Sequence, residues 1–230
     1  MKVRRRTIPR GFTLFEVLII VAVLIIAAVL MLPSFAKSRA RASKTSCTYN
    51  VKQVHLSFRL WALDNGDKFP MQVSVTNGGT MELVDSGSVY VHFLVMSNDL
   101  QTPKILICPQ DADPKRLTAT TFASPTPAGT PGQIPFTNDH SVSYFVGVDA
   151  DETQPQTILT GDANLTVGGV PVSRGLLSLW TNAPVSWTKD RHVNQGNIGL
   201  ADGSVTGVNT PGLRELLMNT GASTNRLAMP

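Results

Sequence analysis

The first long feature of the chain is an apolar run near its beginning. The sequence is almost wholly apolar from Phe12 to Leu32, and no polar side chain occurs from Val17 onward in that run. A helix of this length, at about 1.5 Å per residue, spans about 30 Å, which is the thickness of the hydrocarbon core of a bilayer. The pattern therefore predicts a transmembrane helix over 12–33.

Beyond Pro33 the chain becomes polar but keeps a helical pattern. Apolar side chains recur at steps of four and three residues, a spacing that draws one narrow stripe along a helix. The members of this stripe are Cys47, Val51, Val54, Phe58 and Trp61. Gly66 and Pro70 are typical of a helix end, so we expect a single long helix over 12–63 whose amphipathic half, 34–64, packs on the rest of the chain.

The remainder of the chain contains short β-rich runs separated by Gly, Pro and Asp, which is typical of an antiparallel sheet. The clearest is a hairpin over 196–208 with its turn at Asp202-Gly203. Further expected elements are strands over 104–108, 141–149 and 157–161, a strand or helix over 89–96, an exposed Pro-rich loop over 118–137 and a closing helix over 211–219. The fold class predicted is α+β, with a long N-terminal helix packed on a β-rich domain over 65–230.

Charge separates the N-terminus from the rest of the chain. The formal net charge is +4, but the first eleven residues hold five Lys and Arg and no acidic residue. Removing these five from the 20 basic residues leaves 15 against 16 Asp and Glu. Because the body is close to neutral, it is not expected to bind nucleic acid.

The basic cluster before the apolar run favours a cytoplasmic N-terminus and an extracytoplasmic body. A cleavable secretory signal or a plain signal anchor would give the same hydropathy. Glu16 argues against both, because an ionisable group inside an apolar segment costs about 2.5 to 3.5 kcal/mol on insertion scales. A secretory signal would also end at a small-residue cleavage site rather than continue as a helix.

The segment 10–17 carries a resemblance. A basic leader ends in Gly11, Phe12 follows, and Glu16 lies four residues further on at the head of the apolar run. This arrangement resembles the prepilin-type cleavage and methylation motif of type IV pilins and type II secretion pseudopilins. Pro33 stands where that family commonly has a helix-kinking proline.

The resemblance implies a processing and assembly pathway. A prepilin peptidase would remove the leader 1–11 by cutting between Gly11 and Phe12, and would methylate the new amine of Phe12. Glu16 would then pair with the Phe12 ammonium of a neighbouring subunit, since a carboxylate among apolar groups is stable only when paired or neutralised. The expected location is a single pass through the inner membrane with a periplasmic body.

The function implied is that of a non-catalytic structural subunit of a type II secretion pseudopilus, which assembles by helix packing into a filament for protein export. Its partners would be prepilin peptidase, other subunits and an inner-membrane assembly platform. The alternatives are a major or minor type IV pilin, a fibre-displayed adhesin or binding protein, and a membrane-anchored hydrolase.

The two cysteines, Cys47 and Cys108, are too few for a disulfide scaffold and lack the close spacing of a zinc site. One lies on the helical stripe and the other at the end of a predicted strand. The sequence leaves two states open, a disulfide between helix and sheet or two buried thiols.

The C-terminal part carries a second pattern, in which nine residues separate His192 from Asp202-Gly203. It resembles a C-terminal signature of large pilin-like bacterial proteins whose role is not established. An active site would use His192 as a base beside Asp162 or Asp202, but the sequence shows no nucleophile elbow and no second histidine at ligand spacing. A turn role for Asp202 and Gly203 explains the same residues, and we expect no enzyme.

Calcium is the one cofactor with candidate ligands, because type II pseudopilins bind it in a C-terminal loop. Hard oxygen ligands occur at Asp149, Asp151 and Glu152, and in the run Asp111-Ala112-Asp113. Neither run matches a twelve-residue EF-hand loop, and acidic surface runs are commonly just solvated.

Overall fold

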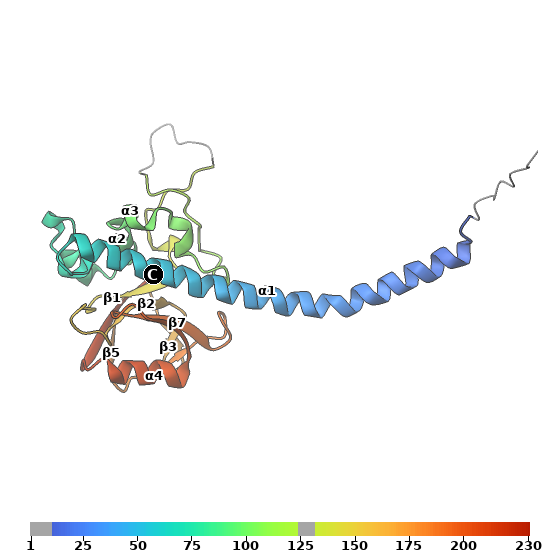
Figure 1. The fold of residues 1–230 in the computed structure, drawn as a ribbon. Helices are drawn as coiled ribbons and strands as arrows, with labels where there is room; N and C mark the ends of the chain where they lie inside the picture. Colours follow the sequence, from blue (N-terminus) through green and yellow to red (C-terminus); the bar gives the residue numbers. More distant parts are fainter. Residues whose placement is uncertain (1–10, 124–131) are drawn as a thin grey trace, which may run out of the picture. The chain divides into compact units, whose positions relative to one another are not determined.

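A computed structural model of the chain describes residues 11–123 and 132–230, without the side chains of residues 30, 32–37 and 40. The chain divides into two units, one ending at Ala42 and the other comprising Ser43–Pro230. The leader expected over 1–11 lies outside the described residues apart from Gly11 itself. The structure is α+β with an antiparallel sheet (Figure 1).

The helix α1 comprises Leu14–Asp64, 51 residues, and continues through Pro33. It ends where the sequence indicated. Gly66 adopts a left-handed φ of 69°, and the amides of Asn65 and Asp67 donate to the Ala62 carbonyl at 2.9 Å. A left-handed residue just past the last turn lets the chain bond back to the exposed carbonyls of the helix end.

The predicted transmembrane half of the fold, 12–33, requires correction, and so does the single-pass inner-membrane location that depended on it. Among the residues that the structure describes, no helix is both long and apolar enough to cross a membrane. A bilayer core takes about 20 consecutive apolar residues. In the described part of α1, the carboxylate of Glu16 also interrupts the apolar side chains within the first turn.

The helix is also not the single packed scaffold that the sequence suggested. Only its part from Ser43 to Asp64 belongs to the compact unit. That part buries the predicted stripe completely or nearly so, since Cys47, Val51, Val54 and Phe58 are 0% exposed and Trp61 is 7% exposed. The prediction of a packed amphipathic stripe is therefore confirmed.

The elements after α1 are short until the first strand. In chain order they are the 3₁₀ helices η1 (Pro70–Gln72), η2 (Val75–Asn77) and η3 (Met81–Ser86), the helices α2 (Tyr90–Leu94) and α3 (Ser97–Leu100), and the 3₁₀ helices η4 (Pro103–Leu106) and η5 (Asp139–Ser141). The strands are β1 (Tyr144–Gly147), β2 (Ile158–Asp162), β3 (Leu165–Val167), β4 (Val170–Pro171), β5 (Gly175–Trp180), β6 (Val185–Trp187), β7 (Gln195–Leu200), β8 (Val205–Asn209) and β9 (Thr224–Met229), with helix α4 (Thr210–Asn219) between the last two.

Six of the strands form one sheet in the order β5-β9-β1-β2-β7-β8, and β4-β3-β6 form a small second sheet. All of these pairs are antiparallel. Strand β1 is buried on both faces. Tyr144 and Val146 pack in the cluster that holds the stripe of α1, whereas Phe145 packs in a second cluster with Leu213 of α4. The large sheet thus lies between α1 and α4 (Figure 1).

The hairpin predicted over 196–208 is confirmed as β7 and β8, and the predicted closing helix is α4. Its turn is wider than two residues, because the Leu200 amide donates to the Ser204 carbonyl at 3.0 Å and the Gly203 amide donates to the Leu200 carbonyl at 3.1 Å. The segment 89–96, left undecided by the sequence, is helical.

The strand predicted over 104–108 is wrong. Pro103 occupies the first turn of a 3₁₀ helix there, and the Thr102 side chain accepts from the Lys104 amide at 3.4 Å. Proline has no amide hydrogen to give to a ladder but fits the first turn of a helix, so this local capping outweighs the apolar run. The predicted strand 141–149 is shorter than expected for a similar reason, since η5 occupies its start.

A disulfide joins Cys47 of α1 to Cys108, across a sequence separation of 61 residues and with the two Cα atoms 5.1 Å apart. Both residues are fully buried. Of the two states that the sequence left open, the structure has the bonded one, and it attaches the helix to the segment that follows η4.

We expect reduction of this disulfide, in the presence of a chelator, to lower the free energy of unfolding by about 4 kcal/mol, because a closed loop of this length restricts the unfolded chain. Urea unfolding with and without reductant measures the change. The double variant Cys47→Ala/Cys108→Ala is the control, and reductant should leave its stability unaltered. Equal stability of the native chain under both conditions would contradict the prediction.

Candidate functional site

Strand β7 runs along the buried part of α1, and polar contacts mark the alignment at each step. The Lys44 ammonium bonds to the Gln195 side chain, and the Thr48 hydroxyl donates to the Asn197 side-chain oxygen at 2.8 Å. Further along, the Arg59 guanidinium donates to the Ala201 carbonyl at 3.2 Å. Fifteen residues of helix and six of strand both span roughly 20 Å, so the two elements advance together.

Close approach of the two elements requires a glycine between these contacts. A Cβ added to Gly199 would lie 2.9 Å from Nδ1 of His55 on α1. Burial, together with the nearby charge of Arg59, lowers the pKa of His55 to about 4, so its imidazole is neutral at pH 7.

The signature formed by His192, Asp202 and Gly203 has one end before strand β7 and the other end after it. They flank β7, which separates them by roughly 20 Å, so His192 and Asp202 do not form one site. Asp202 is an exposed turn residue whose carboxylate accepts from the Ser204 amide at 2.8 Å. Gly203 has φ of 97°, which favours glycine. The turn role considered for these two residues agrees with this geometry.

The other end of the signature is a strained loop before β7. His192, Val193 and Asn194 have consecutive positive φ angles of 53°, 52° and 59°. Each such residue costs about 1 to 2 kcal/mol, so the surrounding structure must hold the loop. The Asn164 side chain does so by donating to the carbonyls of Arg191 at 3.3 Å and Gln195 at 3.4 Å.

The loop directs the imidazole of His192 into the interior. Its Nε2 lies 3.4 Å from Oδ2 of Asp162 and 3.5 Å from Sγ of Cys108, and the side chains of His192 and Asp162 are 0% exposed. Asn197 donates to the same carboxylate oxygen from its backbone amide at 2.7 Å and from its side chain at 2.8 Å. The sequence indicated His192, Asp162 and Cys108 as separate candidates. The structure brings their side chains into one cluster.

Two buried polar atoms in this cluster have no hydrogen-bond partner among the described residues. They are Nδ1 of His192 and Oδ1 of Asp162. Unpaired polar atoms in the interior cost free energy and are uncommon in folded proteins. The cluster therefore stabilises the fold less than a fully bonded one would.

A charged network adjoins the cluster through Arg191. Its guanidinium lies 2.5 Å from Oδ2 of Asp111 and donates to the Ser143 carbonyl at 2.8 Å. The Arg116 guanidinium reaches the same oxygen of Asp111 at 3.0 Å, and the Ser143 hydroxyl donates to it at 2.7 Å. Burial alone would raise the pKa of Asp111, but Arg191, the Ser143 hydroxyl and Arg116 outweigh it and hold the pKa below its ordinary value.

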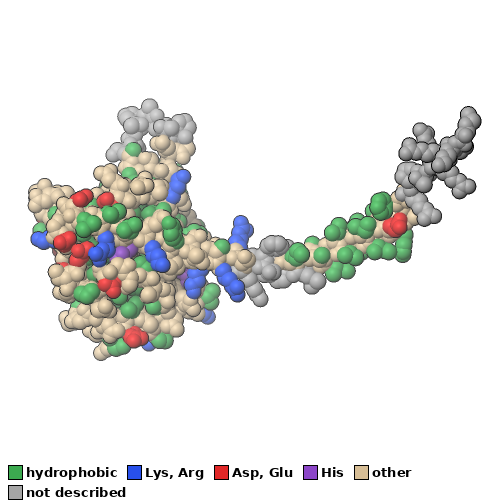
Figure 2. All heavy atoms as spheres, in the orientation of Figure 1, with side chains coloured by type: hydrophobic (Ala, Val, Ile, Leu, Met, Phe, Trp, Pro, Cys, Tyr) green, Lys and Arg blue, Asp and Glu red, His purple; other side chains and the backbone are tan. Residues whose placement is uncertain are grey.

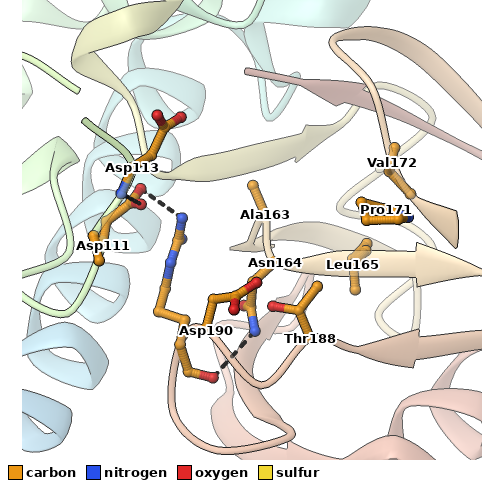
Figure 3. A pocket seen from close by; sticks show the side chains of 11 residues that line it. Asp111, Asp113, Ala163, Asn164, Leu165, Pro171, Val172, Thr188 and Asp190 are labelled. Carbon is orange, nitrogen blue, oxygen red and sulfur yellow. Dashed lines mark hydrogen bonds and ion pairs between the residues drawn. The ribbon is translucent and has the colours of Figure 1, made fainter. Parts of the chain in front are cut away.

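Beside this network the surface is hollowed into a pocket of about 350 Å³. Figure 3 shows Asp111 and Asp113 on one side, Asn164, Thr188 and Asp190 in the middle, and Pro171 with Val172 on the far side. The other lining residues are Ala112, Ala163, Leu165 and Arg191. The described lining contains no Ser, Cys or His. It therefore offers neither a Ser–His nor a Cys–His pair of nucleophile and base.

The calcium candidates do not converge on one point. Asp149 forms an ion pair with Arg226 at 2.6 Å, Asp151 accepts from the Gln72 side chain at 2.8 Å, and Glu152 lies 3.8 Å from Arg59. Asp111, from the other acidic run, is occupied by its two guanidiniums. The calcium site stays a prediction without a ligand arrangement to support it.

Near the N-terminus, Phe12 is exposed and Glu16 lies in the first turn of α1. The Glu16 carboxylate accepts from the Thr13 amide at 2.8 Å and from the Thr13 hydroxyl at 2.9 Å, while that hydroxyl accepts from the Glu16 amide at 3.3 Å. These bonds lower the pKa of Glu16. The arrangement is a capping box, and its sequence signal, Thr followed three residues later by Glu, could have been recognised.

No family model, no curated protein and no solved structure matches this chain. The resemblance of the segment 10–17 to prepilin-type motifs accordingly remains a prediction.

Replacing Asp111 by Asn should lower the free energy of unfolding by about 3 kcal/mol at pH 7, because it leaves two buried guanidiniums without their carboxylate. The folded pKa of Asp111 is lowered, so its contribution is present above the unfolded pKa and disappears as the pH falls through the folded one. Urea unfolding at pH 7 and pH 3 should therefore show a smaller acid loss in the variant.

Asp113→Asn is the matched control, since the Asp113 side chain is 43% exposed and lies 3.9 Å from Arg116. Its loss should stay below about 1 kcal/mol. Equal losses in the two variants would refute a special role for Asp111.

Proposed function

We propose that this chain is a non-catalytic structural subunit of a pilin-like filament, of the type II secretion pseudopilus class, built by packing of the first part of α1 against the same part of other copies. The observation that carries the proposal is the exposure of that part. Between Phe12 and Met31, fourteen large apolar side chains are 45% to 86% exposed. Figure 2 shows the apolar side chains along this segment.

An apolar surface of this extent favours association. Monomeric proteins in water rarely expose contiguous apolar patches above a few hundred Å². Each Leu, Ile, Val or Phe side chain contributes about 1.5 to 3 kcal/mol when it is fully buried. A helix that is apolar on all sides is best covered by several neighbours, which a bundle of identical helices provides.

The first turn supplies an electrostatic reason for a defined alignment. In the single chain, Glu16 is stabilised by its own Thr13 and by the positive end of the helix dipole. Removal of the leader after Gly11 would create an ammonium on Phe12. When helices pack, that ammonium of one copy and Glu16 of another can form an ion pair inside an apolar bundle, where an isolated carboxylate would be costly.

The side chains around the pocket of the body, Ser43–Pro230, also support a structural role. The described pocket lining contains no Ser–His or Cys–His pair, and the buried His192 is directed at a disulfide and a carboxylate rather than at the pocket. A fibre-displayed adhesin would share the exposed apolar segment and the processing motif, whereas an anchored hydrolase would have no need of the processing motif.

Two substitutions separate the charge of Glu16 from its capping role. Glu16→Gln keeps a side chain that can cap the helix but removes the charge, whereas Thr13→Ala removes the cap and keeps the charge. If the ion pair sets the alignment of subunits, Glu16→Gln should reduce filament yield at least tenfold in cells that carry the assembly machinery, and Thr13→Ala should reduce it less than twofold. Electron microscopy and sedimentation of sheared filaments measure the yield. Normal filaments from Glu16→Gln would contradict the proposal.

Gly11→Val tests processing directly. A β-branched side chain beside the scissile bond should block cleavage, so the mass of the variant should retain the leader. The native chain, coexpressed with a prepilin peptidase, should begin at a methylated Phe12. Intact-mass and N-terminal peptide mass spectrometry decide the outcome, and a native chain that still carries its leader would refute the assignment.

A further inference from the structure

We propose that Cys47, Cys108 and His192 form a buried binding site for a thiophilic divalent cation such as Zn²⁺ when the two cysteines are reduced, with Asp162 beside the fourth position. The disulfide is the oxidised, metal-free form of the same site. This inference does not depend on the proposed filament function.

The positions of the donor atoms fit such a site. Both Sγ atoms and a ring nitrogen of His192 all lie within 4.8 Å of one another, and all three residues are buried. In a tetrahedral zinc site with bonds of about 2.3 Å to sulfur and about 2.0 Å to nitrogen, neighbouring donors are about 3.5 Å apart. The observed separation of Nε2 from the Cys108 sulfur is 3.5 Å.

Asp162 lies beside the three donors but does not belong to the group whose ligand atoms are all within 4.8 Å of one another. Its Oδ2 lies 3.4 Å from Nε2 of His192, so it places a negative charge next to a bound cation. The two hydrogen bonds from Asn197 hold this carboxylate in place, as groups that surround a metal site are commonly held.

The surroundings of the cluster are hard to explain as packing alone. The side chains of His192 and Asp162 are fully buried, and Nε2 of His192 is directed both at Oδ2 of Asp162 and at the Cys108 sulfur. Three consecutive residues at positive φ hold the imidazole in place. A bound cation would neutralise the buried carboxylate and offset the strain of the loop.

The disulfide form and the metal-bound form interconvert by transfer of two electrons. A dithiol reductant gives two electrons and two protons to the Cys47–Cys108 bond, which breaks into two thiols as the reductant closes into its own disulfide. Zn²⁺ then binds the two sulfurs as thiolates and releases the two thiol protons. A disulfide oxidant reverses the process by accepting the electrons of the two thiolates, and the metal leaves as the sulfur–sulfur bond forms again.

The test uses the full chain, reduced with a dithiol under anaerobic, metal-free conditions and then freed of reductant. Titration with Co²⁺, followed by displacement with Zn²⁺, should give one equivalent per chain and the near-ultraviolet charge-transfer absorption of thiolate-bound cobalt. Reoxidation should release the metal completely. No binding, or equally tight binding by the oxidised chain, would overturn the proposal.

Variants distinguish this site from two thiols that bind metal on their own. His192→Asn keeps a residue type that tolerates positive φ and should weaken Co²⁺ binding at least tenfold. Asp162→Asn should weaken it between threefold and one hundredfold. His140→Asn is the matched control, because His140 is half-buried in η5 outside the cluster, and it should bind as the native chain does. Native affinity in His192→Asn would refute the site.

A second measurement covers loss of structure on reduction. If the reduced, metal-free chain loses its near-ultraviolet circular dichroism, one equivalent of Zn²⁺ should restore the signal in the native chain but not in His192→Asn. Failure to restore it in the native chain would count against the proposal as directly as absent binding.

Discussion

The alignment of β7 along the buried part of α1 is the interaction on which the body depends. The stripe from Cys47 to Trp61 is removed from water between the sheet and the short helices that precede it, and the polar contacts from Lys44 to Arg59 fix how far along the helix the strand lies. Burial supplies most of the free energy, while these polar contacts select one alignment. The spacing of nine residues between His192 and Asp202 then has a structural explanation. It corresponds to the length of strand β7, which extends from near the disulfide toward the end of the helix.

The two units of the chain solve the problem of apolar surface in opposite ways. Within Ser43–Pro230 the helix buries one stripe of apolar side chains, which the sheet and the short helices before it cover together. In the unit ending at Ala42, the described apolar side chains lie on all sides of the helix and remain exposed. One continuous helix therefore has a part whose apolar stripe is buried within the chain and a part whose apolar side chains are free to pack against other chains.

What could be predicted from the sequence depended on local signals. The stripe, the helix end at Gly66, the hairpin and α4 all arise from periodicity or turn residues within a few positions, and the structure has each of them. Pro103 shows the limit of apolar runs, because capping and a missing amide made a 3₁₀ helix of the expected strand. The capping box of Thr13 and Glu16 is equally local, because a Thr followed three residues later by a Glu is enough to indicate it.

The buried cluster could not be predicted, because its members come from four distant segments and one of them sits in a loop with three left-handed residues that no sequence rule indicates.

The place of β9 in the sheet has a consequence for how the body forms. This last strand lies between β5 and β1, in the interior of the six-stranded sheet, and its final residues are buried. Because β9 pairs with both β5 and β1, each of these two strands has an unpaired edge until Thr224–Met229 is inserted between them. A body in which β9 is displaced would expose two unpaired strand edges at once, and such edges readily pair with other chains, so this strand protects the body against aggregation.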